Sequence, residues 1–106
     1  MSILKSFIDL KKNKLNTTYL THNFHPYPAK FIPQIPKYFI EKFTSENDTV
    51  LDPFVGCGTT LVESKLLNRN SIGVDLNHIA SLISETKSSS LNSDEINSIF
   101  KFIENV

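Results

Sequence analysis

Apolar residues recur every three or four positions along much of this chain, which is the spacing of one face of an α-helix. The pattern predicts four amphipathic helices, at residues 2–12, 31–43, 59–67 and 78–86. A fifth helix is expected to begin at Ser93, whose hydroxyl would cap the first turn ahead of Asp94 and Glu95. Polar residues at 13–21 predict irregular structure, and the serine-rich stretch 87–91 predicts a flexible link.

Two shorter apolar runs lack helical spacing and predict β-strands at residues 49–52 and 71–75. Each run ends at an aspartate, Asp52 or Asp75, and a proline and two glycines predict a loop at 53–58. The order strand, loop, helix, strand is typical of an α/β unit in which a right-handed crossover makes the two strands parallel. In open sheets of this kind, ligands bind beyond the carboxyl ends of the strands. Both aspartates are therefore candidate ligand contacts.

The spacing of the glycine loop and the second aspartate favours a site for an adenosine-containing cofactor. Gly56 and Asp75 are 19 positions apart, close to the roughly 20 that separate a glycine loop from the acid that holds a ribose diol. A carboxylate suits a diol because it can accept both hydroxyl protons. Glycines let the backbone approach a nucleoside without a Cβ in the way.

The residues of the loop decide among adenosine cofactors. Leu61 occupies the position of the third small residue of the dinucleotide motif G-x-G-x-x-G, which disfavours an enzyme that uses a nicotinamide dinucleotide. The chain contains no G-x-x-x-x-G-K-S/T phosphate loop. A cofactor without phosphate is therefore favoured, and S-adenosylmethionine is the main candidate. Asp52 is expected to accept a hydrogen bond from its ammonium group.

Three segments together resemble a known family. Residues 52–60, DPFVGCGTT, resemble the DPFxGxGTT cofactor motif of methyltransferases that modify N4 of cytosine or N6 of adenine in DNA. Residues 72–77, IGVDLN, look like the second motif of that family, whose acid holds the ribose. Residues 25–33, HPYPAKFIP, resemble the motif that packs on the methionine end of the cofactor. The resemblance covers about residues 22–87 and implies a partial Rossmann-like S-adenosylmethionine-dependent methyltransferase fold, with two parallel strands, flanking helices and an incomplete sheet.

The resemblance implies a set of cofactor-binding residues and no catalytic residue in this chain. The first motif would hold the methionine part, Asp75 of the second motif would hold the ribose, and the third motif would flank the cofactor. Asn77, also in the second motif, is a further candidate contact. Lys30 is a candidate partner for the cofactor carboxylate. The candidate contacts are Tyr27, Lys30, Phe31, Asp52, Pro53, Phe54, Gly56, Gly58, Thr59, Thr60, Asp75 and Asn77.

Several of these residues also have a purely structural interpretation. Tyr27, Phe31 and Phe54 could serve core packing, and Asp52 could cap the turn that follows the first strand. Cys57 is interpreted as a small residue in a tight loop, because no base partner for a nucleophile is evident. His22 and His25 have no nearby partners that would complete a metal site, so none is expected.

Composition adds two constraints. Lysine plus arginine and aspartate plus glutamate both number 11, so the net charge is zero, unlike that of most free-standing nucleic-acid binders. A small cluster formed by Lys5, Lys11, Lys12 and Lys14 is interpreted as a solvated helix face. A single cysteine, no apolar run of the roughly 20 residues that span a bilayer, and no cleavage-site pattern of a signal peptide predict a cytoplasmic protein without membrane contact.

A further motif of the resembled family is missing from the chain. That motif is Asp, Asn or Ser followed by Pro-Pro and an aromatic residue, and it binds the target amino group of a base flipped out of the duplex. The five prolines here include no adjacent pair. We therefore expect residues 1–21 to form an N-terminal helix and linker, 22–87 the cofactor-binding part of a methyltransferase domain, and 88–106 a C-terminal helix.

Two hypotheses follow from the missing motif. The chain is a fragment or split subunit of a DNA methyltransferase, inactive without a second chain or domain that carries the catalytic motif and target recognition. Alternatively, it is an inactive truncated gene product with at most weak cofactor binding. In either case the strand at 49–52 would leave an open sheet edge, so the chain alone is expected to be marginally stable.

Overall fold

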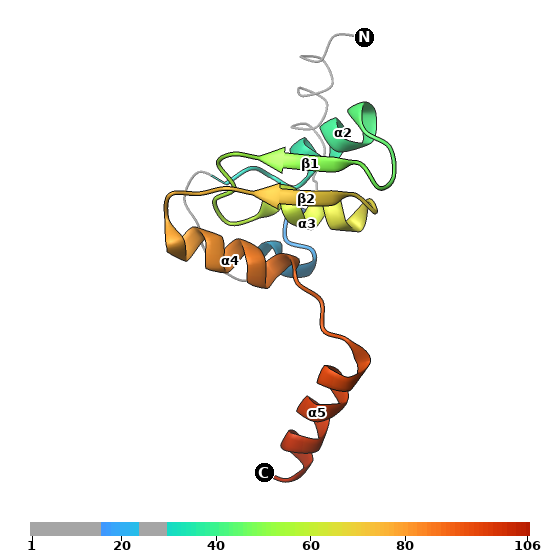
Figure 1. The fold of residues 1–106 in the computed structure, drawn as a ribbon, viewed down its shortest axis with the longest axis vertical. Coiled ribbons are helices and arrows are strands. Elements are labelled where there is room, and N and C mark those ends of the chain that lie inside the picture. Colours follow the sequence, from blue (N-terminus) through green and yellow to red (C-terminus); the bar gives the residue numbers. More distant parts are fainter. Residues whose placement is uncertain (1–15, 24–29) are drawn as a thin grey trace.

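The computed structural model describes residues 16–23 and 30–106 of the chain. The helix expected at 2–12, the lysine cluster and Tyr27 lie outside these residues. The described elements follow the order expected for an α/β unit (Figure 1): η1 (Leu20–Asn23), α2 (Gln34–Phe43), β1 (Thr49–Asp52), α3 (Thr59–Leu66), β2 (Asn70–Gly73), α4 (His78–Ser88) and α5 (Ser93–Glu104).

The two described strands pair in parallel, as the sequence predicts. Their register sets Leu51 beside Ile72 and Asp52 beside Gly73. The connection from β1 to β2 is the glycine loop followed by α3. Because parallel strands point the same way, their carboxyl ends lie side by side, and the chain leaves both strands at that end of the sheet. Residues that follow β1 and residues that follow β2 are therefore neighbours.

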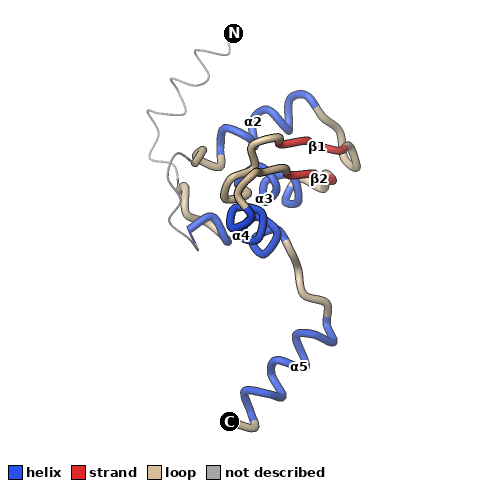
Figure 2. The backbone as a smooth tube through the Cα atoms, turned by 60° about the vertical axis from the view of Figure 1, so that its left-hand side comes forward, coloured by secondary structure: helices blue, strands red, loops and turns tan. Residues whose placement is uncertain are grey.

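Helix α3 is the centre of the molecule. It contacts both strands and also α2, α4 and η1. Figures 1 and 2 show the strands on one side of α3, with α2 and α4 placed beside it. The buried apolar residues gather around this helix: Ile40, Val55, Cys57, Leu61, Val62 and Ala80. The core is small, so residues of α3 and its loop account for most of it.

The sequence placed the limits of several elements wrongly. The first described α-helix begins at Gln34, not at residue 31, and Pro33 occupies its N-cap position. The residue before a proline is held away from helical geometry, which excludes Ile32. Strand β2 covers Asn70–Gly73 rather than 71–75, so Asp75 lies two positions beyond its end.

The C-terminal part needs two further corrections. Helix α4 continues to Ser88, so Lys87 is helical and buried instead of belonging to a flexible link. Helix α5 is capped by Asn92, not by Ser93. The Asn92 side chain accepts a hydrogen bond from the Glu95 N–H and the Glu95 carboxylate accepts one from the Asn92 N–H, a reciprocal capping box. In the N-terminal part, where residues 13–21 were expected to be irregular, Leu20 begins the short 3-10 helix η1.

Large apolar side chains remain exposed on two parts of the described chain. Leu51 and Ile72, paired across the strands, are 61% and 55% exposed on the side of the sheet away from α3. Helix α5 projects away from the body of the molecule, which comprises η1 to α4 (Figures 1 and 2), and buries none of its residues. Among residues 16–23 and 30–106, no helix is both long enough and apolar enough to cross a membrane.

Candidate cofactor site

The glycine loop after β1 is fixed by close packing against α4 and β2. Gly58 has a left-handed backbone with φ of 82°, and a Cβ at this position would lie 2.8 Å from the Cα of Ser84. A Cβ on Gly73 would lie 2.7 Å from a methyl carbon of Val55. Both glycines therefore let segments of this chain approach one another. Gly58 is needed for the loop to contact α4, whatever its relation to a ligand.

A pocket of about 200 Å³ lies at the carboxyl end of the strands. It is built from the segment before α2, the loop after β1, the first turn of α3 and the segment after β2. Its lining residues are Lys30, Phe31, Asp52, Phe54, Val55, Gly56, Cys57, Thr59, Thr60 and Asp75. The two strand-end aspartates, which the sequence singles out separately, thus line one pocket together.

Asp75 is held in place by backbone N–H groups from two different segments. Its Oδ2 accepts a hydrogen bond from the Gly56 N–H at 2.9 Å, and its Oδ1 accepts one from the Asn77 N–H at 2.8 Å. The bonds from Asn77 and then Gly56 lower the pKa of Asp75 below its usual value, because both favour the ionised form. Each oxygen keeps a free lone pair, so the carboxylate can still accept protons from a diol.

Asp52 has both a structural role and a position on the pocket wall. Its Oδ1 accepts a hydrogen bond from the Phe54 N–H at 3.1 Å, which is the turn-capping contact considered for it from the sequence. Within the described residues its Oδ2 has no hydrogen-bond partner, so that oxygen is available to a ligand. Phe54 is 87% exposed, and Phe31 is 59% exposed. Among residues 16–23 and 30–106, neither ring is therefore held by core packing.

Four of the candidate contacts do not line the pocket or cannot be placed. Pro53 and Gly58 belong to the loop but are absent from the lining. The Asn77 side chain caps α4 by accepting a hydrogen bond from the Ile79 N–H at 3.0 Å. Tyr27 lies outside the described residues. Val55 and Cys57 line the pocket but were not among the candidates.

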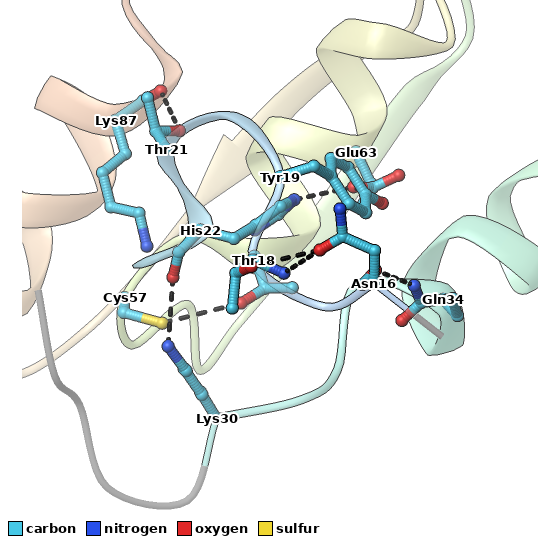
Figure 3. A network of polar contacts seen from close by, with 11 residues as sticks. Asn16, Thr18, Tyr19, Thr21, His22, Lys30, Gln34, Cys57, Glu63 and Lys87 are labelled. Atoms are coloured by element: carbon cyan, nitrogen blue, oxygen red, sulfur yellow. Dashed lines mark hydrogen bonds and ion pairs between the residues drawn. The ribbon is translucent and has the colours of Figure 1, made fainter. Parts of the chain in front are cut away.

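A buried polar layer between η1 and α3 was not predicted from the sequence (Figure 3). His22 and Glu63 are 2% and 1% exposed, and the Nε2 of His22 lies 2.7 Å from the Oε1 of Glu63. The Tyr19 hydroxyl donates to the same oxygen. Burial and then the Glu63 carboxylate raise the pKa of Tyr19 above its usual value. This layer joins the segment before α2 to the centre of α3.

Lys87 extends from the end of α4 into the same region. Its Nζ is buried and has no hydrogen-bond partner among the described residues. Burial is the main cause that lowers the pKa of Lys87; nearby Cys57 opposes this and nearby Lys30 adds to it. In Figure 3 the Lys87 side chain points towards Cys57 and the His22 main chain. In the part of the chain described, no group of three His, Cys, Asp or Glu residues is arranged to hold a metal ion.

Comparison with known proteins identifies the family of this chain. A family model described as DNA methylase, of the N6 and N4 type, matches residues 5–85. The chain belongs to this DNA methylase family. The match includes the glycine loop and both strand-end aspartates, and it ends before α5.

Similar members of the DNA methylase family are much longer than this chain. Type II methyltransferase M.MjaII of Methanocaldococcus jannaschii is 43% identical over 79 residues, which are 74% of this chain and 15% of that protein. Type II methyltransferase M.MvaI of Kocuria varians is 41% identical over 75 residues, 68% of this chain and 16% of that protein. The chain thus spans about one sixth of the length of these relatives.

A solved structure supports the fold. The PvuII DNA methyltransferase, described as cytosine-N4-specific, superimposes with a TM-score of 0.59 over 88% of this chain and 35% of that protein, at 24% identity. At this identity the likeness concerns architecture. It confirms the α/β methyltransferase fold with an incomplete sheet.

Proposed function

We propose that this chain is the S-adenosylmethionine-binding part of a DNA methyltransferase that modifies N4 of cytosine or N6 of adenine, in a restriction-modification setting. The observation that carries the proposal is the shared pocket of Asp52 and Asp75 at the ends of two adjacent parallel strands. Asp75 would accept from the ribose hydroxyls, and the free oxygen of Asp52 would accept from the ammonium group. Membership of the DNA methylase family supports this cofactor.

The remaining pocket residues suit the rest of the cofactor. Phe31 and Phe54 expose aromatic surface at the pocket, which would cover apolar parts of the nucleoside. Lys30 lies on the pocket wall, where its ammonium group would face the cofactor carboxylate. The first turn of α3, at Thr59 and Thr60, directs unpaired N–H groups to the same region. The resulting site would bind one zwitterionic adenosyl ligand without phosphate.

We further propose that a different stretch of polypeptide supplies the catalytic segment and target recognition. No two prolines are adjacent in this chain, so the family motif with Pro-Pro is not contained in it. The exposed side of the sheet, with Leu51 and Ile72, gives such a complement an apolar surface to cover. DNA would be the partner of the assembled enzyme rather than of this chain alone. No methyl transfer to DNA is expected from the 106 residues by themselves.

Titration calorimetry with S-adenosylhomocysteine tests the cofactor site. Asp75→Ala should weaken binding about tenfold or more, because it removes charge-assisted hydrogen bonds to the ribose. Asp52→Ala should weaken binding as well, because Asp52 Oδ2, which is free of the bond to the Phe54 N–H, would accept from the ammonium group. Glu85→Ala removes an exposed carboxylate of α4 that does not line the pocket, and it should leave affinity unchanged.

Two results would contradict the proposal. One is equal affinity in the wild-type chain and Asp75→Ala, which would separate the acid from ligand binding. The other is tighter binding of a nicotinamide dinucleotide than of S-adenosylhomocysteine, which would indicate a dinucleotide-binding protein.

For the second part of the proposal, transfer of a labelled methyl group to DNA should require an added polypeptide with the Pro-Pro motif. Transfer by this chain alone would overturn the need for a complement.

A further inference from the structure

Lys30 reaches the pocket from a segment that has no regular structure, so something else must fix its ammonium group. Its Nζ donates a hydrogen bond to the main-chain carbonyl of His22 at 3.0 Å. Figure 3 shows this bond between the Lys30 ammonium and the His22 carbonyl. An unattached lysine side chain has four flexible bonds and samples many rotamers. The position of the His22 carbonyl therefore limits where the Lys30 ammonium lies.

The His22 residue is itself held by a side chain of α3. Its Nε2 lies 2.7 Å from the Oε1 of Glu63, and both side chains are almost fully buried. Glutamate is rarely buried in the interior of a protein unless it is paired. Glu63 lies one turn of helix after Thr59 and Thr60, which line the pocket. The same helix thus contacts the pocket with its first turn and His22 with its second.

We propose that Glu63 is a positioning residue of the cofactor site. It fixes the imidazole of His22, whose carbonyl then holds the Lys30 ammonium at the pocket wall, opposite the carboxylate of the cofactor's amino-acid part. This inference rests on the proposed function. It adds to that function a dependence of carboxylate recognition on a buried contact outside the pocket, since neither Glu63 nor His22 lines the pocket.

The unpaired Lys87 explains why Lys30 needs this support. In Figure 3 the two lysine side chains approach the His22 main chain from different sides. Both are cations, and the Lys87 Nζ has no hydrogen-bond partner in the described part of the chain. Repulsion between them favours separation of the two ammonium groups. The bond to the His22 carbonyl retains Lys30 despite this repulsion.

The test compares two ligands that differ in the amino-acid part, whose carboxylate Lys30 would bind and whose ammonium group Asp52 would bind. S-adenosylhomocysteine carries the amino-acid part, whereas 5′-methylthioadenosine has the same nucleoside thioether without it. We define the carboxylate preference as the ratio of their affinities for the full 106-residue chain, measured by calorimetry. Lys30→Met should lower this preference about tenfold by weakening only the first ligand. Glu63→Met should lower it to a similar extent.

Three matched variants separate positioning from stability. Tyr19→Phe removes the other hydrogen bond to the Glu63 Oε1, so it should lower thermal stability but keep the preference. Glu63→Gln keeps an oxygen that accepts from both donors, so it should restore the preference. In the Lys30→Met background, Glu63→Met should lower the preference no further. If Glu63→Met does not fold, Glu63→Asp, shorter by one methylene, takes its place in both comparisons.

The results that overturn this inference differ from those that overturn the proposed function. Equal weakening of both ligands by the Glu63 variants would show a general structural role. An unchanged preference in these variants, or a further loss in the Lys30→Met background, would separate Glu63 from Lys30. By contrast, failure of the wild-type chain to bind either ligand, or indifference of both ligands to Asp75→Ala, would remove the cofactor site itself.

Discussion

Helices α3 and α5 show opposite relations between sequence pattern and burial. Helix α5 has a clear apolar stripe, with Ile96, Ile99, Phe100 and Ile103, and a complete capping box, yet none of its residues is buried. Helix α3 has a weak apolar stripe, but Thr59, Leu61, Val62, Glu63 and Ser64 are all buried. Helix α3 also has no side-chain cap at its N-terminus. The comparison teaches that a stripe and a cap do not by themselves bury a helix, whereas neighbouring segments can bury a helix that has neither.

The largest expected effect tests this contrast directly. Leu61→Ala in α3 should lower the free energy of unfolding by about 2–5 kcal/mol, because Leu61 is 8% exposed and its truncation leaves a cavity. Phe100→Ala in α5 removes more atoms, but Phe100 is 60% exposed and should change stability by less than about 0.5 kcal/mol. Urea unfolding followed by circular dichroism measures both. A comparable loss in the two variants would show that α5 packs on the body.

The next prediction concerns the loop that leads into α3. Gly58→Ala should cost about 2 kcal/mol or more, from the left-handed backbone and from a Cβ pressed against Ser84 of α4. Asn68→Ala is the matched control, since Asn68 also has positive φ, at 59°. It should cost only the backbone part, about 1 kcal/mol. Equal costs at the two positions would mean that α4 moves away without penalty.

Local spacing was enough to predict much of this fold. Strand β1 was predicted with correct limits, and its parallel pairing with β2 is confirmed. The prediction that Asp52 and Asp75 meet at the carboxyl end of the strands followed from the same pattern, although Asp75 lies two positions beyond the end of β2. The role predicted for Gly58 was incomplete. A glycine next to a presumed ligand suggested room for that ligand, whereas the structure shows that this glycine also accommodates α4.

The parts that could not be predicted depend on contacts between distant segments. Glu63 carries a charge in a helix of mixed pattern, and nothing nearby in sequence indicates that His22 and Tyr19 will pair with it. Lys87 stands just before three consecutive serines, and so it resembled part of a polar link. Asn92 and Ser93 are both good caps, and only the main-chain geometry decides between them.

Lys87 gives a smaller effect of opposite sign. Replacing its unpaired buried ammonium by Lys87→Met should raise the free energy of unfolding by about 1 kcal/mol. The pKa of Lys87 is lower in the folded chain than its usual 10.5, so the unfolded chain binds more protons just below that pH. Stability of the wild-type chain should therefore rise with pH in this window.

The variant provides its own test of that pH dependence. Lys87→Met should lack the rise, and Lys37→Met, which removes an exposed lysine of α2, should keep it. Measurements should stay below pH 10, because the pKa of Tyr19 is raised on folding from its usual 10.0 and stability falls once the hydroxyl of the unfolded chain ionises. A rise that persists in Lys87→Met would assign the effect to another group.

The smallest expected effect lies in α5 and completes the comparison with α3. Asn92→Ala removes the side-chain half of the capping box and should cost about 1 kcal/mol of local helix stability. Because α5 buries no residue, the change should raise amide hydrogen exchange in this helix while leaving the unfolding of the body and the affinity for S-adenosylhomocysteine unaltered. Asn97→Ala, on the same helix but away from its cap, is the control; alanine has the higher helix propensity, so this variant should not raise exchange. A loss of ligand affinity in Asn92→Ala would show that α5 contributes to the cofactor site although none of its residues is buried.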